Sequence, residues 1–461
     1  MRQFITTLAA GIIVGAVFSA SAQSNAELLN ELNALKSRIS EIEGKLSQNT
    51  STTTGVALPD ATASKLEKPV HWSDIMVGGS KIKIYGFLRM DAIYDDSRPS
   101  NTQVPSFIRS ENAGGVGNQS GPNNEAFNMH PRLTRLGVDL TGPEISGLWN
   151  AKASGKVEVD FYNLIGGVAE SRAALRIRHA YLKLAWDDFS ILAGQTSDLI
   201  SQFYPSVNPD LVMWGAGNLG DRRPQLRFDY RPKLGPGNLL VQGELGFTGA
   251  VDNQNLDGNP FRDGDASGVP TVQGRLGYQI KNWDGQTIEL AGWYHHGREK
   301  SDAPVGASGR QNFTSEAIGL DLKLPLYQDI VSLTGEIWSG KNLNDIRGGI
   351  LQGINATTGQ EINADGGWIE LGVKPCKWNS WHTGYSFDNP RHKDLPIAGV
   401  GGVPAAGPTG RDLNSVWYLG TRLYFSPIEM GLDYLNWTTY YADGIGKGTD
   451  NRFQAFIAYK F

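Results

Sequence analysis

Residues 450–461, DNRFQAFIAYKF, close the chain with apolar and polar positions in alternation. The largely apolar face carries every second side chain, namely Phe453, Ala455, Ile457, Tyr459 and Phe461. Such alternation is typical of a β-strand whose two faces meet different surroundings. The sequence therefore predicts an amphipathic strand that runs to the last residue, with aromatic side chains at its last and third-last positions.

The overall composition limits the possible classes of protein. Hydrophobic residues make up 40% of the 461 residues, 57 residues are Gly, and the mean hydropathy is −0.31. No apolar run of 18 or more residues follows the N-terminal segment, so no transmembrane helix is predicted. Low hydropathy still fits a membrane β-barrel, because residues that face a water-filled interior can be polar. A net charge of −5 gives no reason to expect nucleic acid as a partner.

The N-terminus predicts export from the cytoplasm. Arg2 precedes an apolar stretch over residues 4–20, and Ala20-Ser21-Ala22 follows as a small-x-small cleavage site. Residues 1–22 are therefore predicted to be a secretory signal peptide. The single cysteine, Cys376, cannot form an internal disulfide.

Alternating segments predict sixteen strands in the rest of the chain, so that residues 81–461 form one domain. The predicted strands are 81–95, 131–142, 148–162, 174–186, 189–199, 223–232, 238–248, 271–281, 286–297, 312–324, 330–340, 365–375, 380–388, 413–426, 429–442 and 450–461.

The connections between these strands are predicted to alternate short and long without exception. The short ones include 143–147, 187–188, 282–285 and 426–428, and the long ones include 96–130, 200–222, 249–270, 341–364 and 389–412. Short periplasmic turns and long external loops are typical of outer-membrane barrels. The predicted fold is thus all-β, a transmembrane antiparallel up-and-down β-barrel of about 16 strands in the outer membrane of a Gram-negative bacterium. In such a barrel Tyr459 and Phe461 would form the signal that the barrel-assembly machinery recognises.

Residues 23–48 are predicted to form a short α-helical coiled coil in the periplasm. Its apolar positions are spaced 4, 3, 4, 3 and 4 residues apart at Leu28, Leu32, Leu35, Ile39, Ile42 and Leu46. Opposite charges at flanking positions favour a parallel oligomer, and a single amphipathic helix on the barrel rim is the alternative. Residues 49–80 are expected to be a flexible linker, because residues 49–64 are rich in Ser, Thr, Gly, Ala and Pro.

Four strand segments carry a resemblance to a known family. They are KIYGFLRMDAIYD at 83–95, TRLGVDLTGPE at 134–144, RHAYLKL at 178–184 and LAGQTSD at 192–198. Together with the signal peptide and the coiled coil, they make the chain similar to the DcaP-like trimeric porins. The resemblance implies a passive channel for small anions, with dicarboxylates as the suggested substrates. It also implies a homotrimer in contact with outer-membrane lipid and lipopolysaccharide.

The third long loop, 200–222, is predicted to fold inward and narrow the channel. Met213 and Trp214 could anchor it on the wall, and Arg222 and Arg223 end it beside Arg227. Alternation places further bases inside the barrel, at Lys81, Lys83, Arg89, Arg135, Lys152, Lys156, Arg275, Arg422 and Arg452. Acidic residues share these faces, so the lumen should carry a transverse field. The candidate constriction residues are Arg222, Arg223, Arg227, Arg89, Arg135, Arg176, Arg178, Lys152 and Lys156.

Arg176 and Arg178 break the alternation, because they fall on the outward face of their strand. An Arg at the lipid midplane costs roughly 2–4 kcal/mol. The two residues are therefore expected to lie above the bilayer or to follow a β-bulge.

No enzyme motif is present, and neither catalytic residues, a cofactor nor a metal site is predicted. The loop 251–265 has carboxylates but lacks the Glu that an EF-hand requires. A sugar or general porin remains the alternative channel, since 12 Trp residues could line an aromatic track. A structural barrel whose coiled coil reaches toward the cell wall is the alternative outside the channel class.

Overall fold

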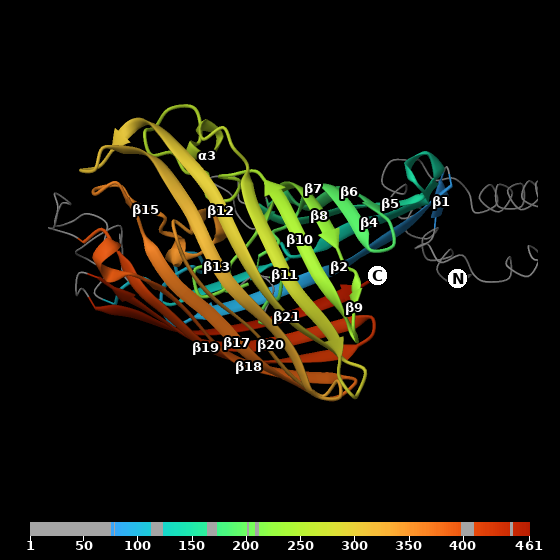
Figure 1. The fold of residues 1–461 in the computed structure, drawn as a ribbon. Coiled ribbons are helices and arrows are strands. Elements are labelled where there is room, and N and C mark those ends of the chain that lie inside the picture. The colour runs from blue at the N-terminus through green and yellow to red at the C-terminus, as the bar shows by residue number, and fades with distance from the viewer. Residues whose placement is uncertain are drawn as a thin grey trace, which may run out of the picture. The chain divides into compact units, whose positions relative to one another are not determined.

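The computed structural model describes residues 75–77, 79–111, 123–163, 173–200, 202–207, 212–397, 410–442 and 446–461 (Figure 1). All of them belong to one compact unit, Val70–Phe461. The predicted signal peptide, coiled coil and most of the predicted linker lie outside the described residues. Within the range 49–80, β1 (Ile75–Val77) pairs with the beginning of the first long strand.

Sixteen long strands among the described residues form the wall of a barrel. They are β2 (Ser80–Asp95), β4 (Arg135–Ile145), β5 (Ala151–Asn163), β6 (Ala174–Ala185), β7 (Phe189–Ser197), β8 (Arg222–Tyr230), β10 (Gly237–Gly246), β11 (Thr271–Lys281), β12 (Thr287–Val305), β13 (Arg310–Tyr327), β14 (Val331–Lys341), β17 (Asn363–Cys376), β18 (Asn379–Pro390), β19 (Arg411–Phe425), β20 (Ile428–Tyr441) and β21 (Lys447–Lys460). Each pairs antiparallel with the next, and β21 pairs with β2. The predicted closed antiparallel barrel of sixteen strands is confirmed.

Short elements complete the described part of the chain. β3 (Ala126–His130) continues the line of β4, because both pair with β2. β9 (Lys233–Leu234) continues the line of β8, because both pair with β10, and β15 (Ile354–Asn355) pairs with β16 (Gln360–Glu361). The helical segments are η2 (Ser146–Leu148), α3 (Asp263–Ala266), η4 (Asn344–Ile346), η5 (Gly349–Leu351) and η6 (His392–Asp394). No helix in the described ranges is long and apolar enough to cross a membrane.

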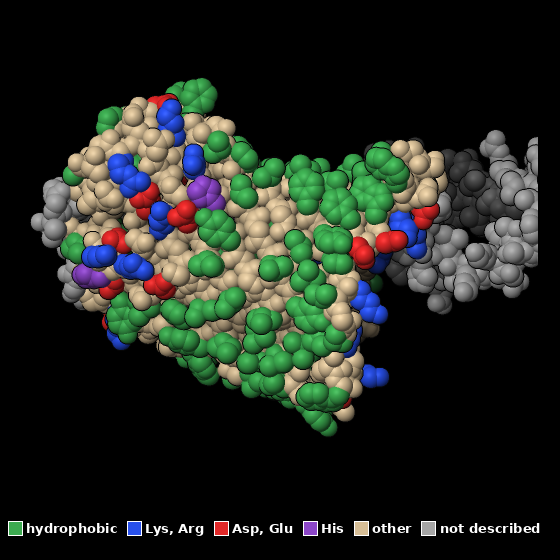
Figure 2. Space-filling view, in the orientation of Figure 1, with side chains coloured by type: hydrophobic (Ala, Val, Ile, Leu, Met, Phe, Trp, Pro, Cys, Tyr) green, Lys and Arg blue, Asp and Glu red, His purple; other side chains and the backbone are tan. Residues whose placement is uncertain are grey.

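The two faces of the wall differ as the alternation predicts. On β2, Ile84, Leu88 and Met90 point outward, and the Leu88 side chain is 56% exposed, whereas Arg89 and Asp91 are buried in the interior. Apolar side chains accordingly cover much of the outer surface (Figure 2). An apolar outside and a charged inside fit a barrel whose outer face contacts lipid.

One expected external loop is wrong. The predicted strands left residues 298–311 as a long connection, but β12 continues to Val305 and β13 begins at Arg310. Only residues 306–309 turn the chain, so the alternation of short and long connections has an exception here. The two strands continue past the apolar belt as a hairpin, because ladder pairing between them persists as far as Lys300 and Asn312 and resumes at Val305 and Arg310.

Candidate pore constriction

The segment between β7 and β8 crosses the barrel interior. Met213 is fully buried against Val416, Leu435 and Trp437, which point inward from β19 and β20. Leu219 lies in a second apolar cluster with Trp338 on the opposite side of the segment. The segment is therefore held inside the barrel by apolar contacts at both of its sides.

A close backbone contact fixes the far end of this inward loop. Trp338 Nε1 donates a hydrogen bond to the Gly217 carbonyl at 2.7 Å. Gly217 has φ +112°, and a Cβ there would lie 2.3 Å from the carbonyl oxygen of Gly367 on β17. Only glycine permits this approach, because any side chain would meet the wall backbone.

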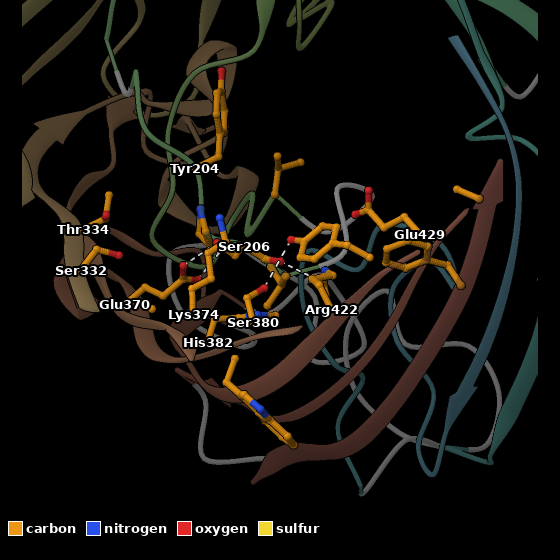
Figure 3. A pocket seen from close by; sticks show the side chains of 18 of the residues that line it. Tyr204, Ser206, Ser332, Thr334, Glu370, Lys374, Ser380, His382, Arg422 and Glu429 are labelled. Atoms are coloured by element: carbon orange, nitrogen blue, oxygen red, sulfur yellow. Dashed lines mark hydrogen bonds between the residues drawn. The ribbon is translucent and has the colours of Figure 1, made fainter. Parts of the chain in front are cut away.

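Polar contacts fix the near part of the loop. The Ser206 amide and hydroxyl donate to Glu370 at 2.7 Å and 2.6 Å, and Arg422 donates to the Ser206 carbonyl (Figure 3). Glu370 also accepts from the Tyr418 hydroxyl at 3.1 Å. These bonds tie the loop to β17 and β19, across the lumen from the strands that precede and follow it.

A cavity of about 720 Å³ lies beside this loop within the barrel (Figure 3). Its lining includes basic and acidic side chains in a ratio of seven to three, with Arg89, Arg135, Arg178, Arg222, Lys374, Arg422 and Lys460 as the bases and Asp329, Glu370 and Glu429 as the acids. Four of the arginines come from one wall, on β2, β4, β6 and β8. Ser332, Thr334 and Glu370 come from β14 and β17, on the opposite side of the sixteen-strand ring.

A β-bulge turns Arg176 and Arg178 into the interior. Val157 pairs with Ala180 and Glu158 with His179, but Val159 pairs with Ile177, so β6 contains one extra residue. The extra residue reverses the alternation toward the external end, and Leu175 and Ile177 face outward instead. The second of the two expected explanations, a bulge, is the one that the structure shows.

The two arginines then pair with acids on β5. Arg176 binds Asp160 through Nε at 2.9 Å and Nη2 at 2.6 Å. Arg178 lies 2.7 Å from Glu158 and 3.1 Å from Asp160, and Arg135 lies 3.5 Å from the same Glu158. Three guanidinium groups thus share two carboxylates.

Arg222 adds to the positive charge of this wall. Its Nη1 lies 3.4 Å from Asp221, whose other oxygen is 2.8 Å from Arg347. The Nε atom of Arg222 is buried without a hydrogen-bond partner among the described residues, and the Nε atom of Arg135 has Glu158 at 3.5 Å. Arg178 is close enough to both arginines for their charges to interact. We call Arg135, Arg176, Arg178, Arg222 and Arg347 the arginine cluster; it faces three acids, Glu158, Asp160 and Asp221.

Not all of the predicted constriction residues line the cavity. Arg223 is fully buried between Asp198 and Asp345, at 2.6 Å and 2.8 Å, because it joins the loop to the wall rather than facing the lumen. Arg227 pairs with Asp229 at 3.2 Å, and Lys156 pairs with Asp139 at 2.8 Å. Lys152 is exposed near the start of β5. None of these four belongs to the cavity lining, whereas Arg89, Arg135, Arg178 and Arg222 do.

The sequence did not single out four residues that the structure brings to the site: His179, Tyr204, Ser206 and Glu370. Alternation along β17 could have placed Glu370 inside. Arg347 lies over the Trp214 ring, 4.6 Å from its centroid. Its place at the site depends on contact between two loops, so no pattern in the neighbouring sequence could have predicted it.

The described part of the chain contains no group of three or more His, Cys, Asp or Glu side chains placed as metal ligands. At the external end, burial raises the pKa of Asp263 to about 6. Burial and the neighbouring Asp345 charge raise the pKa of Asp252 to about 7. These carboxyl groups belong to the packing of the external loop 249–270.

A closed barrel with an apolar outer belt and an inward loop beside a charged lumen defines a porin, a channel of the outer membrane. The chain belongs to the DcaP outer membrane protein family, whose sequence pattern matches residues 15–329. No curated protein matches the chain.

Solved structures share the fold. The crystal structure of the outer membrane channel DcaP of Acinetobacter baumannii has a TM-score of 0.63 and 17% identity, and covers 84% of this chain and 100% of its own. An anion-selective porin from Comamonas acidovorans has a TM-score of 0.52 and 11% identity, and covers 83% of this chain and 100% of its own. At these identities the likeness extends to the fold alone.

Proposed function

We propose that this porin gives passive passage to small hydrophilic solutes with a preference for anions, dicarboxylates among them. The observation that carries the proposal is the arginine cluster, in which five guanidinium groups face three carboxylates beside the inward loop. The excess positive charge lies where the loop narrows the lumen.

The physical basis is the field of a narrow opening with low-dielectric walls. Such an opening focuses field lines and raises the local concentration of ions of the opposite sign. Arginine is suited to this task, because it stays charged and its planar fork can bind a carboxylate at two points. An anion that leaves water at this level would regain hydrogen bonds from the guanidinium groups of Arg222 and Arg135, which line the cavity.

The opposite wall supports passage rather than tight binding. Ser332 and Thr334 offer hydroxyl groups that can replace hydration water, and Glu370 is already occupied by Ser206 and Tyr418. A solute would therefore meet charge on one side and neutral polar groups on the other. Conduction requires such moderate binding, since a solute must leave the site as well as enter it.

The interior tryptophans give the sugar-channel alternative little support. Trp293, Trp338 and Trp437 are at most 3% exposed. They are covered by loops, so their rings are not open faces on which a sugar could stack.

We also propose a homotrimer, on the basis of the resemblance and of the heptad pattern within residues 23–48. Its outer belt would contact outer-membrane lipid, including lipopolysaccharide, and its last strand would be inserted by the barrel-assembly machinery. The coiled coil would lie in the periplasm.

The zero-current potential of the purified full-length protein in a planar bilayer with a KCl gradient tests the proposal. A potential of the sign that chloride permeation produces is expected. A potential of the opposite sign would contradict an anion preference, and the absence of channel conductance would favour the structural-barrel alternative.

A further inference from the structure

Two glycines pair with each other on the outer surface of the barrel. Neither the backbone conformation nor any neighbouring atom of this chain requires glycine at these two positions. Gly243 on β10 pairs directly with Gly274 on β11, and both belong to the outward set of positions. Neither has a positive φ, and a Cβ on Gly243 would meet no heavy atom within 4 Å. A Cβ on Gly274 would meet only the Gln242 carbonyl, at 4.0 Å. Glycine weakens a strand interior, and where nothing internal requires it, it often marks the close approach of something outside.

Gly274 lines an apolar groove on the outer wall, and Gly243 lies directly beside it on β10. The groove has a volume of about 1030 Å³ and runs from Val241 and Gly274 across Gly292 to β17. Its sides are exposed apolar residues such as Leu276, at 60%, and Ile318, at 63%. Figure 2 shows areas of backbone or uncharged polar side chains among the apolar side chains on the face that carries β10 to β13.

The groove continues toward the middle of the wall. A second depression of about 410 Å³ shares Leu320, Ile337 and Phe387 with the first. Outward-facing glycines again belong to it, since Gly335 and Gly367 are part of its lining. The outer surface of the barrel thus has an extended apolar groove, whereas bulky side chains cover the rest of this surface.

Charged residues stand at the external end of the groove. His296, Glu316 and Lys341 follow one another across β12, β13 and β14 in the row directly beyond Tyr294 and Ile318. Lys341 Nζ lies 3.2 Å from Glu316, and His296 Nδ1 lies 3.3 Å from it. Arg298 and Lys300 are exposed further along the same outward face of β12. This outward face of β12 to β14 therefore carries three Lys and Arg side chains, Arg298, Lys300 and Lys341, beside two acids, Glu316 and Asp302, and the surplus positive charge suits an anionic group.

We propose that the groove binds an acyl chain of a phosphorylated glycolipid of the outer leaflet, with a phosphate beside Lys341 and Arg298. An apolar channel that ends in a basic row matches a molecule with an apolar tail and an anionic head. The acyl chain buries apolar surface over the glycines, and the phosphate gains charge-assisted hydrogen bonds. This binding is independent of the solute preference of the lumen. A second copy of this chain is the competing occupant, and the test distinguishes the two.

The test fills the groove without disturbing the wall. In Gly243→Val/Gly274→Val, the added methyl groups project into open space, and valine favours the strand conformation. Ser415→Val on β19 is the matched control, because it adds bulk to an outward position outside the groove lining. Each full-length protein is extracted from outer membranes in mild detergent, checked for heat-modifiable mobility and oligomeric state, and titrated with hexa-acylated diphosphoryl lipid A.

We expect the filled variant to bind the lipid about tenfold more weakly, a change of 1.4 kcal/mol, while Ser415→Val binds as the wild type does. Lys341→Ala/Arg298→Ala should weaken binding of the diphosphoryl lipid but not of its dephosphorylated form, and Lys341→Arg should bind normally. Unchanged lipid binding by the filled variant would overturn the proposal. A loss of oligomers in the filled variant, with lipid binding intact, would assign the groove to contact between copies.

Discussion

Arg223 forms a bidentate ion pair with Asp198, with Nε 2.6 Å from Oδ1 and Nη2 3.1 Å from Oδ2. The same guanidinium reaches Asp345 at 2.8 Å, so one buried side chain joins β8 to the beginning of the inward loop and to the segment η4. Arg223 therefore acts on the shape of the lumen without lining it.

Arg223→Ala should release the inward loop. Removing one partner of a buried ion pair typically costs about 3–5 kcal/mol, because the remaining charges stay buried without compensation. The sixteen-strand wall does not depend on this contact, so we expect a folded barrel with larger and noisier single-channel conductance. Arg227→Ala is the control, since its pair with Asp229 lies within one strand. Conductance identical to the wild type would show that the loop needs no such contact.

Gly217→Ala should displace the far end of the same loop. The new Cβ would lie 2.3 Å from the Gly367 carbonyl and 2.8 Å from that of Phe387, in addition to the strain of φ +112°. Gly258→Ala is a matched control, because Gly258 also has a positive φ, +71°, but no heavy atom within 4 Å of its Cβ position. Higher conductance is expected in the first variant only. Equal conductance in both would mean that contact with β17 does not set the pore size.

Deleting Phe461 should lower the yield of inserted barrel. The Phe461 amide donates to the Gly86 carbonyl at 3.0 Å, and the Gly86 amide donates to Phe461 at 3.1 Å, so the last residue closes the seam between β21 and β2. Heat-modifiable protein in outer-membrane fractions measures the yield, and Phe461→Tyr, which keeps the ring, should behave normally. A normal yield after deletion would remove the last residue from the assembly signal.

The external loop 249–270 should pack less tightly as pH rises. Burial and the Asp345 charge hold the pKa of Asp252 at about 7, above the usual value of about 3.9. A raised carboxyl pKa leaves the packing intact at low pH, and the cost of ionisation grows from about pH 4 to about pH 7. Limited proteolysis of this loop should therefore be faster at pH 8 than at pH 5. Asp252→Asn should flatten the dependence, and an equally steep dependence in that variant would contradict this account.

Alternation along the strands was sufficient to predict the barrel, because each of the sixteen strands has one face toward lipid and one toward the lumen where it crosses the apolar belt. It placed Arg89 and Arg135 correctly inside. Alternation failed at the β-bulge beside Arg178, where one extra residue reverses which side chains face inward. The bulge depends on pairing with β5, and its only trace in the sequence is a pair of charged residues at positions that should face outward.

The roles of individual residues at the site could not be predicted, because they depend on contacts between loops. The sequence indicated that residues 200–222 fold inward, but it treated Arg222 and Arg223 as equivalent. Their side chains point in different directions from β8. Arg223 forms a buried ion pair with Asp345, and this pairing could not be predicted because Asp345 lies more than a hundred residues away in the sequence. Such assignments require the three-dimensional meeting of segments distant in the chain.

The zero-current potential of Arg222→Glu in a KCl gradient tests the central claim most directly. Arg222 lines the cavity and belongs to the arginine cluster, and its replacement changes the local charge by two units. Arg227→Glu changes the charge equally outside the cavity lining, and Arg222→Lys keeps the charge at the same place. We predict that the potential shifts toward cation preference in Arg222→Glu and remains near the wild-type value in the other two. An Arg222→Glu channel with the wild-type potential would contradict the claim that the arginine cluster selects anions.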